Sequence, residues 1–324
     1  MRIATSTVYS QGVTAINTQN FKLNKTMMQL STGKRIVVPS DDPAGAARVL
    51  GLNQAKSRTG QFQDNISTVK SSLQIEETAL NGAVNSLQRI RELSIQANND
   101  TYNATQRSDI ALEIQEQLEA ITSFANTTNG NGEFLFGGFD NRDAPFVNNS
   151  GTIEYQGDQG QQFLQIGATR QIASGDNGFD VFMNIKGTTK IDPANLSPMS
   201  VFAVVGELEA VLSTNQGLVD PPPPAVPVTT ETFHDSMSRI IGNIDQALGH
   251  VADAQAAIGA RLNATESQEN VNEDYLVQLA STLSDTQDLD YTEAISRLQQ
   301  QQIGLQASQQ TFTKIQGLSL FNFL

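Results

Sequence analysis

The feature of this sequence that most constrains its fold is a seven-residue spacing of apolar side chains. In the longest stretch the spacing runs from Met237 to Thr286, in alternating steps of four and three residues. Such a pattern places the repeated positions on one face of an α-helix that packs against another helix. A single helix of about 50 residues would be roughly 75 Å long. Residues 265–272, in its middle, are polar, so the packing face is either weak there or meets a polar partner.

Shorter stretches with the same seven-residue spacing lie both before and after this long stretch in the sequence. The spacing occurs at residues 13–30 and 66–90, and residues 291–315 place Tyr, Leu, Leu and Phe at intervals of seven. A further helix, with its apolar residues on one face, is predicted at 110–124. The chain therefore predicts long helices near both of its ends.

Capping and turn-forming residues mark where these helices begin and end. Gly33 favours the end of the first helix, since glycine readily adopts the left-handed capping conformation. Asp42 followed by Pro43 is typical of an N-cap and a first helical residue. Asn-Asn-Asp at 98–100 predicts a turn before the helix at 110–124.

Residues 129–232 differ in character, being rich in Gly, Asn and aromatic residues. Three segments in this window are predicted to be strands, at residues 152–156, 162–166 and 179–185. One helix is predicted at 199–212. The window ends in Asp-Pro-Pro-Pro-Pro at 220–224, which is typical of a stiff polyproline connector.

The predicted fold class is mainly α: a long antiparallel helical bundle or coiled coil formed by the N- and C-terminal arms, with an inserted, β-containing (α+β) outer domain. Residues 1–40 and 288–324 are expected to form paired terminal helices. Residues 41–128 and 233–287 are expected to form the bundle core. Residues 129–232 would then be the outer insert.

The terminal helices are unusually poor in charge. Residues 1–30 carry only Arg2, Lys22 and Lys25, and residues 299–324 carry only Lys314. The surface helices of a monomer normally have a charged outer face. We therefore expect neighbouring subunits to cover these helices. The alternative is that they pack only against their own chain.

The residues expected at the subunit interface are the apolar members of the two terminal patterns. They are Ile16, Leu23, Met27, Leu30, Leu298, Leu305, Phe312 and Ile315. The final segment, residues 318–324, has four large apolar residues among its last five. Left exposed, such a segment favours aggregation, which again indicates a covering partner.

Charge and composition exclude several function classes. The net charge of −14 argues against nucleic acid, because phosphate binding needs a basic patch. No run of 18 apolar residues exists, so no membrane insertion is expected. Cysteine is absent, which excludes disulfides and zinc–thiolate sites. The first residues lack the apolar segment of a secretory signal, so export would need another route and no cleaved signal peptide.

No motif indicates catalysis, a cofactor or a metal. His234 and His250 lack partners at metal-binding spacing. Thr-Gly-Lys at 32–34 lacks the other residues of a phosphate-binding loop. The aspartates at 285, 288 and 290 lack the Gly and Glu of a calcium loop. The carboxylates of the insert (Asp140, Asp143, Glu154 and Asp158) read as surface-loop residues, so we expect no enzyme, cofactor or metal site.

Two segments near the N-terminus resemble a known family. They are Leu-Ser-Thr-Gly-Lys-Arg-Ile at 30–36 and Pro-Ser-Asp-Asp-Pro-Ala-Gly at 39–45. Together they resemble the N-terminal signature of the flagellin superfamily. The Pro-Ser-Asp-Asp-Pro form, the opening residues 1–5 and the ending 318–324 are more similar to the hook–filament junction proteins than to the flagellins. The resemblance covers roughly residues 1–125 and 235–324.

The resemblance implies a function that the spacing alone does not. Such proteins form a ring of subunits between hook-associated protein 1 and the flagellin filament, outside the bacterial cell. They are exported unfolded through the flagellar type III apparatus with the help of a cytoplasmic chaperone. The terminal helices would form the inner tube and the insert would face outward. The alternatives are a flagellin-type filament subunit, or an insert that binds glycans or host surfaces.

Overall fold

The computed structural model describes residues 5–188, 196–214 and 231–321, with side chains from 7 to 187, 198 to 214 and 231 to 314. Within these ranges the chain is mainly α, as predicted. Its contacts divide it into two units. Unit 1 comprises Met1–Gly60 and Glu273–Leu324, and unit 2 comprises Gln61–Asn272.

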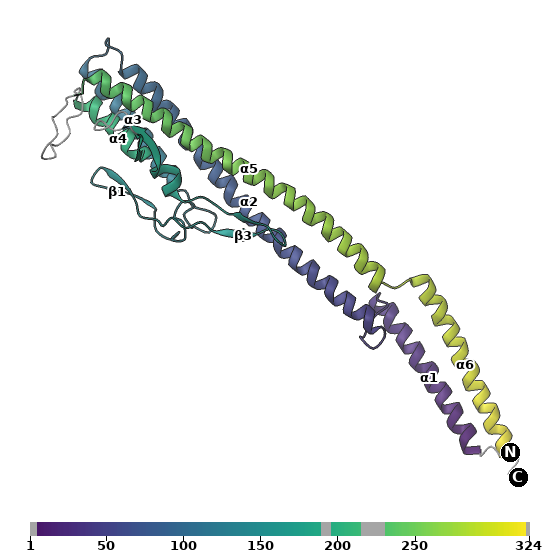
Figure 1. Cartoon of the computed structure of the whole chain (residues 1–324). Helices are drawn as coiled ribbons and strands as arrows, with labels where there is room; N and C mark the ends of the chain where they lie inside the picture. Colours follow the sequence, from purple (N-terminus) through teal and green to yellow (C-terminus); the bar gives the residue numbers. More distant parts are fainter. Residues whose placement is uncertain (1–4, 189–195, 215–230, 322–324) are drawn as a thin grey trace. The chain divides into compact units, whose positions relative to one another are not determined.

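In unit 1 the two terminal helices pack against each other, as predicted. Helix α1 (Thr5–Thr32) and helix α6 (Tyr291–Phe321) lie side by side over their length (Figure 1). The unit also contains the first part of α2 (Pro43–Ala97) and the last part of α5 (Phe233–Gln287).

The predicted helix ends are confirmed. The backbone N–H of Gly45 donates to Asp42 Oδ1 at 2.9 Å, so Asp42 caps α2 at Pro43. Helix α1 ends at Thr32, and Gly33 follows with a φ of 67°. After the predicted turn, Asn103 caps α3 (Ala104–Ala125).

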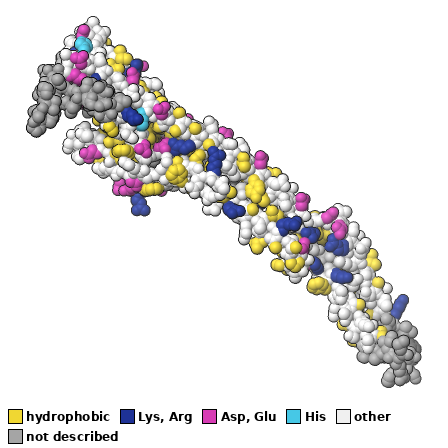
Figure 2. All heavy atoms as spheres, viewed as in Figure 1, with side chains coloured by type: hydrophobic (Ala, Val, Ile, Leu, Met, Phe, Trp, Pro, Cys, Tyr) yellow, Lys and Arg dark blue, Asp and Glu magenta, His cyan; other side chains and the backbone are white. Residues whose placement is uncertain are grey.

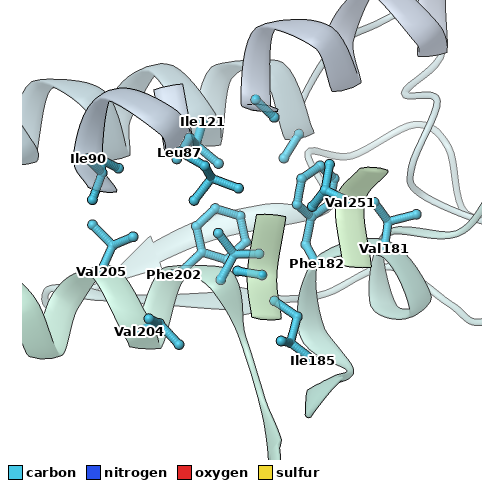
Figure 3. Packing of buried hydrophobic residues seen from close by; sticks show 14 of the residues in the cluster. Leu87, Ile90, Ile121, Val181, Phe182, Ile185, Phe202, Val204, Val205 and Val251 are labelled. Atoms are coloured by element: carbon cyan, nitrogen blue, oxygen red, sulfur yellow. The ribbon is translucent and has the colours of Figure 1, made fainter. Parts of the chain in front are cut away.

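Unit 2 is held by one hydrophobic core, which α2, α3, α5 and the insert share. The heptad positions Leu73, Leu80 and Leu87 of α2 are fully buried. Figure 3 shows Leu87, Ile90 and Ile121 facing Phe202 and Val205 of the insert's helix α4 (Val201–Thr214). The described part of the window at 129–232 is therefore packed onto the helices of unit 2, and its aromatics Phe136, Phe146, Phe182 and Phe202 are buried there.

The described residues of the insert form three two-stranded antiparallel sheets. They pair β1 (Phe146–Asn149) with β2 (Thr152–Tyr155), β3 (Phe163–Gln165) with β4 (Gln171–Ala173), and β5 (Ile185–Thr188) with β6 (Leu196–Met199). Strands β2 and β3 lie where the sequence predicted them. The helix predicted at 199–212 is α4, which begins two residues later because Met199 closes β6.

The strand predicted at 179–185 is wrong for most of its length. Phe179–Met183 forms one turn of π-helix, η1, and a strand begins only at Ile185. The adjacent residues Val181 and Phe182 are both buried, whereas neighbouring residues of a strand point to opposite faces. Just before the turn, the side-chain oxygen of Asn177 accepts from the N–H of Asp180 at 2.8 Å.

The polar middle of α5 meets a polar partner, one of the two outcomes expected from the sequence. Asn272 is buried, and its amide donates to the carbonyl of Ile166 at 2.9 Å, in the loop between β3 and β4. The buried Thr265 hydroxyl donates back to the carbonyl of Arg261. The predicted connector at 220–224 lies outside the described residues.

Candidate subunit interface

The two terminal helices are closely packed near the start of α1. The rings of Tyr9 and Phe312 lie 5.3 Å apart between centroids, inclined at 50°. A Cβ atom at Gly12 would lie 2.6 Å from Phe312 Cδ2, so glycine lets the Phe312 ring approach the backbone of α1. The pair therefore has a defined register in a single copy of the chain.

Six of the eight predicted interface residues share the same degree of burial. Ile16, Leu23 and Leu30 of α1, and Leu298, Leu305 and Phe312 of α6, are each half-buried. Their remaining surface leaves room for contact with a second molecule. The side chain of Ile315 lies outside the described residues.

Met27 departs from the predicted helix-pairing seam. Its side chain is 45% exposed, whereas Thr26 and Gln29 beside it are buried. The Gln29 amide donates to the carbonyl of Arg35 at 2.6 Å. At its C-terminal end α1 thus packs on the loop that follows it, and the heptad register that places Met27 inward does not continue. Met27 points outward, and its role at a subunit interface stays a prediction.

The two helix breaks of unit 1 are joined by backbone hydrogen bonds. The N–H of Arg35 donates to the carbonyl of Gln287 at 2.7 Å, and the N–H of Leu289 donates to the carbonyl of Gly33 at 3.0 Å. The Arg35 guanidinium donates to the carbonyl of Thr286 at 2.8 Å. We call this arrangement the break joint. It holds the end of α1 and the start of α6 in fixed register.

The signature residues at 39–43 (Pro-Ser-Asp-Asp-Pro) hold the loop after α1. Asp41 pairs with Lys25 Nζ at 2.8 Å and also accepts from the N–H groups of Val37 and Val38. The hydrogen bond from Lys25 and those two N–H groups lower the pKa of Asp41 below its usual range. Asp42 caps α2 and lies 3.6 Å from the guanidinium of Arg35. The resemblance identified the motif, and the structure shows what its two aspartates do.

An apolar groove lies beside this loop. Its walls include Phe21 and Met28 of α1 together with Val37 and Val38. Phe21 is 70% exposed, and Met28 and Val38 are exposed as well. The surface of α1 and α6 shows few charged side chains and scattered apolar ones (Figure 2). Large apolar side chains on a charge-poor surface are typical of a protein–protein contact.

Sequence reasoning missed a buried charged cluster in unit 2. Glu76, at a heptad position of α2, is 1% exposed, and burial raises its pKa to about 8. The N–H of Asp176 donates to Glu76 Oε1 at 3.0 Å, and Asp176 pairs with Arg261 of α5. The cluster links the insert to both long helices. A carboxylate among the apolar heptad positions 66–90 was the available signal.

The other polar candidates have structural contacts. Asp158 accepts hydrogen bonds from the N–H groups of Phe139, Asp140 and Gly160, which shape a loop. His234 lies between Asn98 and Asp100, and His250 contacts the carbonyl of Asp180. Among the described residues no three His, Cys, Asp or Glu side chains are grouped to hold a metal ion. No described helix has the length and apolar character needed to cross a bilayer.

Sequence comparison finds two family regions in the chain. The bacterial flagellin N-terminal helical region matches residues 3–141, and the bacterial flagellin C-terminal helical region matches residues 241–324. Flagellar hook-associated protein 3 of Escherichia coli K12 is 30% identical over 322 residues, which cover 99% of each chain. A flagellin of Clostridium tyrobutyricum is 38% identical, but over only 38% of this chain and 33% of its own length.

Comparison of structures agrees at the level of the fold. The crystal structure of flagellar hook-associated protein 3 from Legionella pneumophila superposes with a TM-score of 0.62 at 23% identity. The match covers 72% of this chain and 97% of the Legionella chain.

Proposed function

The chain belongs to the family of flagellar hook-associated protein 3, the structural protein of the hook–filament junction, and on this premise we propose that it forms the adaptor ring of a bacterial flagellum. In this role a ring of identical subunits meets hook-associated protein 1 on one side and the flagellin filament on the other. The observation that carries the proposal is the match to hook-associated protein 3 along 99% of both chains.

The paired terminal helices would provide the contacts within the assembly. Their apolar seam is half-buried in one copy, and their outer faces are poor in charge. Neighbouring subunits would complete the burial of Ile16, Leu23, Leu30, Leu298, Leu305 and Phe312, and would cover the outward-pointing Met27. Ile315 belongs to the same proposed interface. Removing the remaining exposed apolar area of these side chains from water would favour association, roughly in proportion to that area.

The family places the protein in the flagellum; the finer arrangement is part of the proposal. Residues 1–40 and 288–324 would form the inner layer, residues 41–128 and 233–287 the middle layer, and residues 129–232 the outward-facing layer. The chain would leave the cell unfolded through the flagellar type III apparatus, without a cleaved signal peptide, after binding a cytoplasmic chaperone. As a structural subunit it would need no cofactor and catalyse no reaction.

A second candidate is a flagellin-type filament subunit. The two matching family regions are described as flagellin helical regions, and together they include both terminal helices. Flagellins share the helical ends but polymerise with themselves into long filaments. Against this candidate, the flagellin relative covers only 38% of the chain.

Deletion of the gene in its source bacterium tests the proposal and separates the two candidates. The cells are imaged by electron microscopy, and flagellin in the culture medium is measured by immunoblot. Bare hooks with flagellin released into the medium are expected, because exported flagellin would have no base to grow from. Bare hooks without flagellin in the medium would favour the filament subunit.

Restoring the gene from a plasmid provides the control, since it should return attached filaments. Normal filaments in the deletion strain, in the absence of a second copy of the gene, would contradict both candidates.

A further inference from the structure

The charges of unit 1 are segregated by sign along the chain. Residues 1–60 contain eight Lys or Arg and two Asp, namely Arg2, Lys22, Lys25, Lys34, Arg35, Arg48, Lys56, Arg58, Asp41 and Asp42. Residues 273–324 contain six Asp or Glu and two Lys or Arg, namely Glu273, Asp274, Asp285, Asp288, Asp290, Glu293, Arg297 and Lys314. One unit thus combines a net basic segment with a net acidic one, although the whole chain is acidic.

Most of these charges are exposed and form no ion pair with a described residue. The basic surface is Lys22, Lys34, Arg48, Lys56 and Arg58, and the acidic surface is Glu273, Asp274, Asp285, Asp288 and Asp290; all ten are exposed. Within the described part of the chain none of the ten forms an ion pair. The ion pairs of unit 1 join other residues: Lys25 with Asp41, Arg35 with Asp42 and Glu293 with Arg297.

Unit 2 provides the internal comparison, since it contains the other parts of the same two long helices. There Lys70 of α2 pairs with Glu269 of α5 at 2.9 Å, and Arg91 of α2 pairs with Asp245 of α5. In unit 1 no ion pair joins the described residues of α2 to those of α5, although one segment is basic and the other acidic. Within the described residues of one copy, the ten charges of the basic and acidic surfaces are therefore not neutralised by ion pairs.

Large apolar side chains accompany the charges on both surfaces. Leu50, on α2 close to Arg48, is 62% exposed. On α5, Val277 is 71% exposed and Tyr275 is exposed beside Asp274. Figure 2 shows dark blue and magenta side chains at the surface where α2 and α5 meet the terminal helices. Apolar anchors surrounded by charges match the core and rim of a protein interface.

We propose that the basic surface of one copy docks on the acidic surface of the next copy, so that subunits associate head to tail around the ring. This inference rests on the proposed ring and names the contact that closes it. A contact between two different surfaces of identical chains is heterologous, and it generates rings when the rotation closes. Opposite charges steer the copies together and oppose wrong registers, because like charges facing each other across an interface are costly.

Charge reversal tests the head-to-tail contact in the full chain. One variant carries Arg48→Glu, Lys56→Glu and Arg58→Glu, and a second carries Glu273→Lys, Asp274→Lys and Asp285→Lys. Each is expressed in the deletion strain, and attached filaments are counted per cell. Each variant alone should reduce this number by about tenfold or more, because each interface then joins surfaces of the same sign.

Co-expression of the two variants tests directly whether the two surfaces bind each other. The reversed basic surface of the first variant matches the reversed acidic surface of the second, and their unaltered surfaces match as well. Carbodiimide, which joins Lys amines to carboxylates in contact, should cross-link the two variants to each other and should not cross-link either to itself. Filament number should recover severalfold relative to either variant alone.

Matched controls carry the same charge changes in unit 2. Arg142→Glu, Arg170→Glu and Lys186→Glu match the first variant, and Asp109→Lys, Glu116→Lys and Glu119→Lys match the second. Both controls should retain normal filament number. Circular dichroism of each purified variant checks that the helices are retained.

Normal filament numbers for the two reversed variants would overturn the proposal. Loss in both without recovery or mutual cross-linking on co-expression would overturn it too, and would indicate that the surfaces bind a different protein. If deletion of the gene leaves filaments normal, the proposed function fails first. If deletion abolishes filaments and the reversed variants restore them, only the head-to-tail contact fails.

Discussion

The backbone N–H of Leu289 donates to the carbonyl of Gly33 at 3.0 Å, which joins the residue that follows α1 to the turn that precedes α6. These residues are far apart in sequence, and each lies at a break between two helices. The bond, together with the bond from Arg35 to Gln287, fixes the register of the terminal pair.

Gly33→Ala should weaken the break joint. The φ of Gly33 is 67°, and an added Cβ would lie 2.8 Å from the hydroxyl oxygen of Tyr291. A left-handed backbone costs roughly 1–2 kcal/mol for a residue with a side chain. The amides of Arg35 and Leu289 should therefore exchange hydrogen faster, as measured by NMR or mass spectrometry. Gly51→Ala is the control, because it lies within α2 with nothing within 4 Å of the added Cβ, and it should leave both amides unchanged.

Asp42→Ala should destabilise the start of α2. The substitution removes the acceptor for the N–H of Gly45, and loss of an N-cap typically costs about 1 kcal/mol. Asp42→Asn keeps an acceptor and should retain most of the stability. Urea unfolding followed by circular dichroism measures both variants. Equal midpoints for the Ala and Asn variants would show that the cap contributes nothing.

Leu305→Asp should abolish attached filaments without unfolding unit 2. The charge enters the half-buried seam of α6, and burying an unpaired carboxylate is unfavourable. Attached filaments are counted in the deletion strain, and hydrogen exchange of the amides at 61–97 of α2 and 233–272 of α5 reports on unit 2. Ser296→Asp, at an exposed site early in the same helix, should retain filaments. Normal assembly by Leu305→Asp would contradict the interface assignment.

Glu76 should make the stability of unit 2 depend on pH. Burial, and then the nearby charge of Asp176, raise its pKa from the ordinary 4.5 to about 8, while Arg261 acts in the opposite direction. Between these values the folded chain holds a proton that the unfolded chain has released. The free energy of unfolding should therefore fall as pH rises from about 4.5 to about 8. Each unit of pKa difference corresponds to about 1.4 kcal/mol.

Glu76→Gln tests this dependence. The amide keeps an acceptor for the N–H of Asp176 and cannot ionise. Urea unfolding of both chains at pH 5 and pH 8.5 should show a smaller loss of stability in the variant than in the wild type. An identical pH dependence would show that Glu76 does not hold the proton. Asp109→Asn, at an exposed site of α3, is the control for loss of a carboxylate.

Local signals account for what was predicted correctly. The heptad spacing predicted the long helix at 237–286, and the cap at Asp42 and Pro43 predicted the start of α2. These signals act between residues a few positions apart, so they can be recognised without a structure. The turn at 98–100 was found in the same way.

Two features depended on tertiary contacts that the helix and strand periodicities do not show. Val181 and Phe182 read as part of a strand, but packing of Phe182 against Phe136 and Phe146 is compatible with one turn of π-helix. Met27 fits the heptad by spacing, but the loop after α1 turns Gln29 inward instead. The partners of Phe182 are far from it in sequence, and Arg35, the partner of Gln29, lies in the loop beyond the end of α1. Helix and strand periodicity therefore reveals neither contact.

The sequence by itself determined the long helices and the positions of their ends, because periodicity and capping are properties of short segments. The tertiary structure alone decided which charges are paired. Lys70 meets Glu269 in unit 2, while Lys56 and Glu273 of unit 1 form no ion pair within the described residues. An ion pair requires two side chains within about 4 Å of each other, and that proximity arises only when segments distant in sequence are packed together.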